Sequence, residues 1–246
     1  MLEIIAVGCF TCVFFLGMDY LRMGLHGTAQ SRTLSAVNTV YCAHGVILHV
    51  VFMWILFSLF RSADSSHSVY SFEFAQYVVQ HTDTLLHADD FFAHALRWIV
   101  LCSMGFFCYS ILIMNTIMEA KMITTHHVVI LFAYAAALFF DWERLAPHLI
   151  PLVCVAEFVA PVLGSLMKLS LMRMEGLFAI LEKTAMLLTL GIFFLYKLPV
   201  FVGQCWYTIS MMADWRVTAW VTCYAVLHGY AWFHSIRNLI LVQRFR

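Results

Sequence analysis

The sequence predicts an all-α integral membrane protein with about seven transmembrane helices. Of its 246 residues, 63% are hydrophobic and only 11% are charged, and the mean hydropathy is +0.86. A water-soluble domain of this size needs more polar surface than that composition supplies. The apolar residues also form runs that are long enough to cross a bilayer as helices, which takes roughly 20 residues each.

The apolar runs follow one another with short connections. The first run starts at residue 2 without a basic leader or a small-residue cleavage site, so we interpret it as a retained span rather than a signal peptide. We expect an N-terminal helix and loop at residues 1–30, followed by one membrane domain at residues 31–246. The expected spans are residues 2–21, 37–60, 93–118, 125–141, 145–168, 176–202 and 215–241.

A polar insertion at residues 61–92 interrupts this pattern. Its apolar residues are spaced as on one face of a helix: Phe72, Phe74, Tyr77, Val78 and Leu85. That spacing predicts a helix lying on the membrane surface. Four polar residues recur at intervals of four, three and four, namely Asp83, His87, Asp90 and His94. We expect them to share one helical face that meets solvent or a partner, with a divalent cation as the alternative.

The charges and cysteines exclude several classes of protein. Fourteen basic residues balance fourteen acidic ones, so there is no electrostatic case for nucleic-acid binding. Most of the eight cysteines fall inside apolar runs, which argues against an exported disulfide framework.

Lys and Arg counted by side predict the orientation of the chain. Eight follow the first, third and fifth spans or lie at the C-terminus: Arg22, Arg32, Lys121, Lys168, Arg173, Arg237, Arg244 and Arg246. Five lie on the opposite side: Arg61, Arg97, Arg144, Lys197 and Arg216. The imbalance places the C-terminus in the cytosol or the mitochondrial matrix and the N-terminus on the far side.

Two adjacent histidines, His126 and His127, open the span at 125–141. Thr124 or Thr125 can cap this helix, which would place both histidines in its first turn. The partial positive charge of a helix N-terminus disfavours a second proton on an imidazole. A neutral histidine there suits acyl transfer or hydrolysis as a base. The alternative is that both residues anchor the helix at the headgroup boundary.

Glu157 is the other polar residue that is costly to place in a membrane. It lies near the middle of the fifth span, between Pro151 and Pro161. A carboxylate at that depth needs a partner or a proton, so the helix either lines a cavity or forms an internal hydrogen bond. Four further histidines could face the same interior: His44, His49, His228 and His234. No clustered histidine boxes of the di-iron type occur among the twelve histidines, and no metal site is expected.

Six stretches between about Ser31 and Leu241 resemble, in order and spacing, the motifs of the TLC domain (TRAM/Lag/CLN homology), a family of multi-pass membrane proteins that includes the ceramide synthases. They are Ser35-Ala36-Val37-Asn38 through His44; Gly105-Phe106-Phe107-Cys108-Tyr109; His126-His127-Val128; Glu157-Phe158-Val159-Ala160-Pro161; Phe193-Phe194 before Lys197; and Leu227-His228-Gly229-Tyr230-Ala231-Trp232-Phe233. The resemblance implies a six-helix barrel around a lipid-sized tunnel, with one further helix outside. It also implies that His126, His127, Tyr109 and Glu157 point inward.

The chain departs from the family pattern at several positions. Ser110 stands where the family has aspartate, and Lys197 stands where it has arginine. The acidic pair that follows the histidines in ceramide synthases has no counterpart near residues 141–143. A histidine without an acid lacks the group that orients it, so ceramide synthase activity is disfavoured.

Three functions remain open. The first is lipid binding or lipid homeostasis without full catalytic machinery, in which Tyr109, Glu157, His228 and His44 contact a bound lipid. The second is a non-catalytic subunit of a larger membrane complex. The third is an acyl-CoA-dependent lipid acyltransferase with His126 and His127 as catalytic residues. The endoplasmic reticulum and the mitochondrial inner membrane are the expected locations. No cofactor other than bound lipid is expected.

Overall fold

The computed structural model describes residues 2–62, 71–113, 121–157, 184, 187–188, 190–212 and 214–244. Every regular element among these residues is a helix, which confirms the all-helical prediction. Within the described part of the chain, four helices are long and apolar enough to cross a membrane: Leu2–Gly24, Arg32–Arg61, Asp90–Ile113 and Leu190–Met211. The chain is therefore consistent with an integral membrane protein, and the seven-span barrel stays a prediction.

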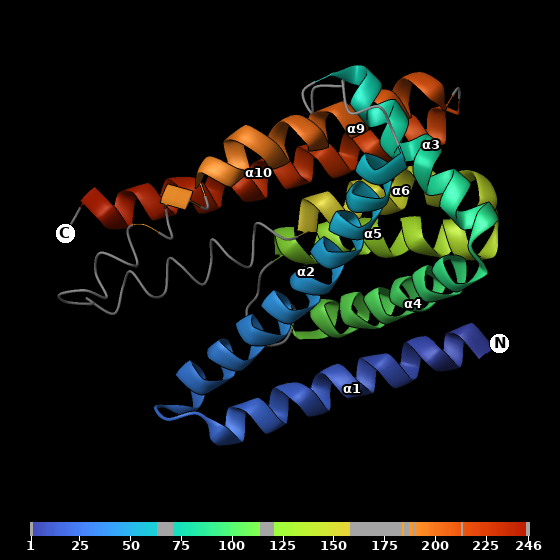
Figure 1. The fold of residues 1–246 in the computed structure, drawn as a ribbon. Coiled ribbons are helices and arrows are strands. Elements are labelled where there is room, and N and C mark those ends of the chain that lie inside the picture. Colours follow the sequence, from blue (N-terminus) through green and yellow to red (C-terminus); the bar gives the residue numbers. More distant parts are fainter. Residues whose placement is uncertain are drawn as a thin grey trace.

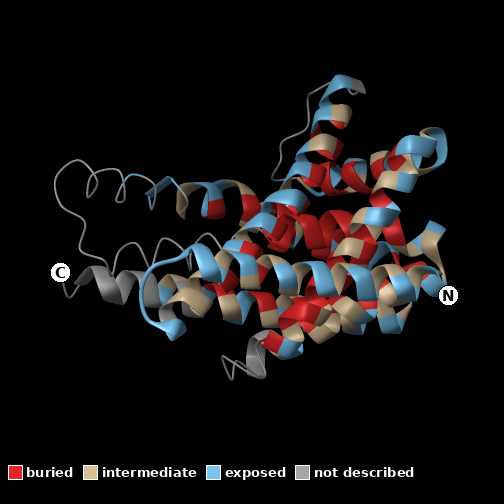
Figure 2. Cartoon of the chain, turned by 90° about the horizontal axis from the view of Figure 1, so that it is seen from below, coloured by how far each residue is buried: buried red, intermediate tan, exposed pale blue. Residues whose placement is uncertain are grey.

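The helices form one bundle. Their bounds are α1 Leu2–Gly24, α2 Ala29–Ser62, α3 Phe72–Ala88, α4 Asp90–Ile113, α5 Lys121–Phe139, α6 Trp142–Glu157, the π-helical turn η2 Phe193–Lys197, α9 Leu198–Met211 and α10 Trp215–Arg244. Helices α1, α4, α5 and α10 run side by side, α2 crosses them obliquely and α3 lies at one end (Figure 1). The buried residues gather in the middle of the bundle (Figure 2). Large apolar side chains such as Phe57, Phe132 and Trp206 stay exposed on its outside, as expected of a surface that faces lipid.

Helix α1 lies on the outside of the bundle, and its main contact is with α4. The two backbones come close at Gly105, where an added Cβ atom would lie 2.5 Å from the Cβ of Phe10. The Oγ1 of Thr11 donates to the Val7 carbonyl of its own helix at 2.8 Å and shares this hydrogen bond with the Gly105 carbonyl at 3.2 Å. Small residues at such crossings let membrane helices pack closely, because no side chain separates the backbones.

The insertion forms a helix, α3, as predicted, but the prediction that it lies on the membrane surface is wrong. A helix does form there, and its N-cap Ser71 accepts a hydrogen bond from the Phe74 backbone N–H at 3.2 Å. However, Phe74 and Val78 are buried in the bundle, where α3 packs against α6 and α9. Burial against protein removes these side chains from lipid, whereas Tyr77 stays exposed.

The predicted polar stripe is wrong, because α3 and α4 divide it. Two members lie on each helix: Asp83 and His87 on α3, then Asp90 and His94 on α4. Asp89 separates the helices in an extended conformation, and its Oδ1 accepts a hydrogen bond from the Phe92 backbone N–H at 3.0 Å. This aspartate therefore ends one helix and caps the next, so the even spacing does not define a common face.

Two local predictions also change. Helix α5 begins at Lys121 rather than after a cap at Thr124 or Thr125, so His126 and His127 lie in its second turn. Lys197 lies inside the helix Leu190–Met211 and is fully buried, so it does not belong among the loop charges that predict orientation. The predictions that concern Pro161, Lys168, Arg173 and the His234 side chain fall outside the described residues.

Candidate functional site

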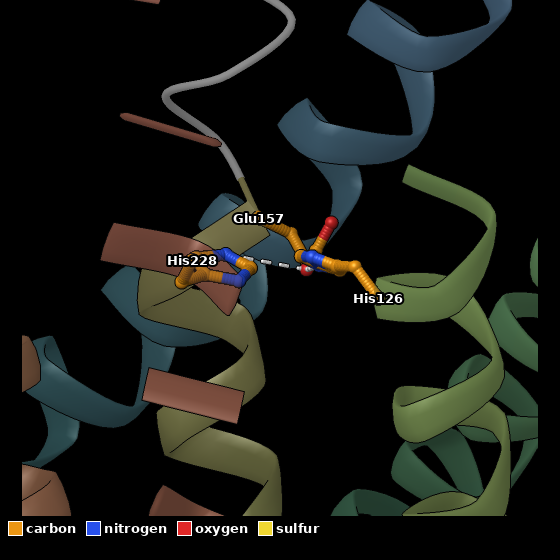
Figure 3. Close-up of side chains that lie close together, drawn as sticks. All are labelled: His126, Glu157 and His228. Atoms are coloured by element: carbon orange, nitrogen blue, oxygen red, sulfur yellow. Dashed lines mark hydrogen bonds and ion pairs between the residues drawn. The ribbon is translucent and has the colours of Figure 1, made fainter. Parts of the chain in front are cut away.

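Three titratable side chains from three helices meet inside the bundle. His126 comes from α5, Glu157 from the end of α6 and His228 from α10 (Figure 3). Glu157 Oε1 lies 3.0 Å from His126 Nε2 and 3.5 Å from His228 Nε2. The two imidazole ring centroids are 4.1 Å apart, and all three side chains are buried. We refer to these residues as the His–Glu–His cluster.

Two further polar groups surround Glu157. The hydroxyl of Tyr224 donates a hydrogen bond to Glu157 Oε1 at 3.3 Å. Lys197 is fully buried and close enough to Glu157 for the two charges to attract each other. Its Nζ donates to the Val155 carbonyl at 3.4 Å. Lys197 belongs to the π-helical turn η2, a local widening of the helix that is often found at functional sites. Glu157 therefore has both hydrogen-bond donors and a cation nearby.

The second histidine of the adjacent pair belongs to a different polar group. His127 Nδ1 lies 2.6 Å from the Oγ of Ser110, which is also hydrogen-bonded to the hydroxyl of Tyr41. Consecutive residues on a helix point about 100° apart, so His126 and His127 face different neighbours. Their rings still lie 5.1 Å apart, which places the two groups next to each other. Ser110 thus supplies the hydrogen-bond partner of His127.

His44 and Tyr109 are buried elsewhere in the bundle. His44 Nε2 lies 3.0 Å from the Oγ of Ser103, and its ring stacks on Phe106 with centroids 3.8 Å apart. The Tyr109 ring packs against α1, 4.9 Å from the ring of Phe15. Within the described part of the chain, no hydrogen bond or ion pair joins either residue to the His–Glu–His cluster. Of the predicted lipid contacts, the fold therefore brings together only Glu157 and His228.

The prediction that the histidines lack an acid is wrong for His126. Glu157 fills that role for His126, although the acid lies 31 positions further along the chain and on another helix. A search for an acid close to the histidines in sequence could not find it. Tyr224 was also missed, yet its spacing of four residues from His228 places both on one face of α10 and was a usable signal.

The cluster can act in two chemical ways. A neutral His126 oriented by a carboxylate is the arrangement of a general base. Alternatively, the ligand atoms of His126, Glu157 and His228 all lie within 4.8 Å of one another, which is close enough to share one metal ion.

The chain matches no protein-family model, no curated protein and no solved structure. Its membership of the TLC family therefore stays a prediction from the motifs.

Proposed function

We propose that the chain is a TLC-like integral membrane protein that binds a lipid inside its bundle, with the lipid headgroup at the His–Glu–His cluster. One observation carries this proposal: ionisable side chains from three helices converge deep in a bundle whose outside is apolar. Ionisable groups inside a membrane are costly, and they usually mark a ligand site or an ion path. In this proposal the membrane is that of the endoplasmic reticulum or the mitochondrial inner membrane.

The TLC-type barrel is part of the proposal. It assigns six helices to a barrel around a lipid-sized tunnel and α1 to the outside. The exposure of α1 supports this assignment, because only 11% of its 18-residue apolar stretch is buried. The close packing of α1 against Gly105 also fits a helix that lies on the outer face of α4.

The surroundings of the cluster suit a lipid headgroup with its chain attached. The cluster provides imidazole donors and a carboxylate acceptor, and Tyr224 adds a hydroxyl beside it. Beside it, the rings of Phe201 and Trp232 lie 5.7 and 5.0 Å from the ring of His228. The Trp232 indole N–H is buried and has no hydrogen-bond partner among the described residues. Buried donors are normally paired, so this N–H is available to a lipid oxygen.

The test is to extract the full chain with a mild detergent and to identify the lipid and protein that co-purify by native mass spectrometry. We expect about one lipid per chain in the wild type. Glu157→Gln should lower lipid retention by at least about tenfold, because a hydrogen bond to a charged group contributes about 1.5–3 kcal/mol. His87→Ala, at an exposed histidine on α3, is the matched control and should retain the lipid. A wild-type chain without lipid would refute the proposal, and co-migration with a large complex would favour the subunit alternative.

Acyl transfer from acyl-CoA to a lipid is a second candidate, and the 3.0 Å contact between His126 and Glu157 favours it. This contact supplies the orienting acid that the sequence near the histidines lacks. General-base catalysis contributes about 10²–10⁴-fold to a rate. We therefore expect His126→Ala to lower labelled acyl transfer by that factor while the protein stays folded. If wild-type protein transfers no acyl group to any membrane lipid offered, this candidate fails.

A further inference from the structure

We propose that His126, Glu157 and His228 bind one divalent transition-metal ion. This inference goes beyond lipid binding and does not require it. The three residues offer two imidazole nitrogens and one carboxylate oxygen, all buried and all within 4.8 Å of one another. Two histidines and one carboxylate are a ligand set that zinc and ferrous iron both accept.

The distances fit a shared ion. Ligand atoms at about 2.1 Å from a tetrahedral zinc ion lie about 3.4 Å from each other. Glu157 Oε1 lies 3.0 Å from His126 Nε2 and 3.5 Å from His228 Nε2, on either side of that value. Movements of a few tenths of an ångström would therefore bring each of these two pairs to a metal-binding separation, and the two imidazole nitrogens lie within 4.8 Å of each other. Because α5, α6 and α10 each supply one ligand, no helix has to bend to form the site.

The crowding at one oxygen atom also favours a metal ion over hydrogen bonds alone. His126, Tyr224 and His228 all approach the same atom, Glu157 Oε1. A carboxylate oxygen has about two lone-pair directions, and the hydrogen bonds with His126 and Tyr224 fill both, so His228 Nε2 at 3.5 Å is left to another partner. With an ion between the rings and the carboxylate, both imidazoles turn a lone pair to the metal. Tyr224 then keeps its hydrogen bond to Glu157 and orients it, as groups behind metal ligands commonly do.

Lys197 provides the competing explanation. A buried lysine beside Glu157 can balance the carboxylate charge without a metal ion. The two explanations differ in what Lys197→Met does. If the lysine alone balances the charge, the wild-type chain binds no metal, and only the variant, with its unbalanced carboxylate, gains a reason to bind one. If a metal binds, removal of a neighbouring positive charge should leave its affinity unchanged or raise it.

The experiment measures the metal content of the full chain in detergent. The purified protein is treated with a chelator, incubated with Zn²⁺ or, without oxygen, with Fe²⁺, desalted and analysed by elemental mass spectrometry. We expect about one ion per chain, and the metal that binds more tightly identifies the occupant. The variants His126→Ala, Glu157→Gln and His228→Gln should each lower metal affinity by at least about tenfold, since even groups behind the ligands contribute 10–100-fold. His127→Gln is the matched control, because this neighbouring histidine contacts Ser110 instead, and it should bind metal like the wild type.

A measurement on the wild type alone protects the test against variants that misfold. A ligand that binds only the folded state raises the melting temperature with its concentration. Added Zn²⁺ or Fe²⁺ should therefore stabilise the chelator-treated wild-type chain. Less than about one ion per ten wild-type chains, or equal metal content in wild type and cluster variants, would overturn the proposal. Lipid content is measured on the same samples, so failure to bind metal is distinguished from failure to bind lipid.

Discussion

Replacement of Gly105 by alanine tests the packing of α1 against α4. The added Cβ would lie 2.5 Å from the Cβ of Phe10 and 3.0 Å from the Thr11 backbone nitrogen and the Val7 carbonyl oxygen. Favourable carbon–carbon contacts lie at about 3.5–4.0 Å, so α1 must move away by about 1 Å. That movement also weakens the hydrogen bond from Thr11 to Gly105.

The size of the effect follows from three contributions. Overpacking of this kind costs about 1–3 kcal/mol, and the weakened hydrogen bond costs up to about 1 kcal/mol. Alanine stabilises a helix by about 0.5–1 kcal/mol relative to glycine, which offsets part of the loss. We therefore expect Gly105→Ala to lower the free energy of unfolding by about 1–3 kcal/mol. For a chain of this size, each kcal/mol corresponds to about 2–4 °C in melting temperature.

The assay is thermal unfolding in one detergent, with tryptophan fluorescence as the readout. Gly203→Ala is the matched control, because a Cβ there would lie 3.7 Å from the Cβ of Ala75, an ordinary contact. This control should melt at the wild-type temperature or slightly above it. If Gly105→Ala behaves like the control, then α1 does not pack on α4 through this glycine, and the reasoning is refuted.

Three further predictions follow from buried or paired groups. In the chelator-treated chain, Lys197→Met should lower the free energy of unfolding by up to about 3–5 kcal/mol, because it leaves the Glu157 carboxylate without its nearby cation. Adding Glu157→Gln should recover part of this loss in denaturant titrations, and strictly additive losses would show that the two residues are not coupled. Phe74→Ala should lower stability by about 3–5 kcal/mol in the same assay, whereas a loss below about 1 kcal/mol would mean that α3 faces lipid. A ring hydrogen bond with the Asp83 carbonyl and then the Asp83 carboxylate raise the pKa of the exposed His87 above its ordinary value. The stability from this pair is therefore fully present below the ordinary pKa of about 6.5 and lost as pH rises through the raised value. Asp83→Asn should shift the His87 midpoint to lower pH in histidine NMR, and an unchanged midpoint would contradict the assignment.

The sequence alone determined the helical character of the chain and its relation to the membrane. A helix closes its hydrogen bonds between residues four apart, so a run of apolar residues is enough to predict it. The run at the start of the chain appears as α1, and the run at 93–118 appears as α4 as far as the described residues extend. His126, His127 and Glu157 could likewise be singled out, because a polar residue in an apolar run is conspicuous whatever surrounds it.

Only the tertiary structure decided which of these residues belong together. His126 and His127 are adjacent in sequence, yet one meets Glu157 and the other meets Ser110. Side-chain direction on a helix turns by about 100° per residue, so small differences in packing decide which neighbour each ring contacts. His228 lies on a helix far along the chain, and its place beside His126 depends on how α5 and α10 pack. Contacts between helices depend on all the side chains at the interface, and no local pattern records them.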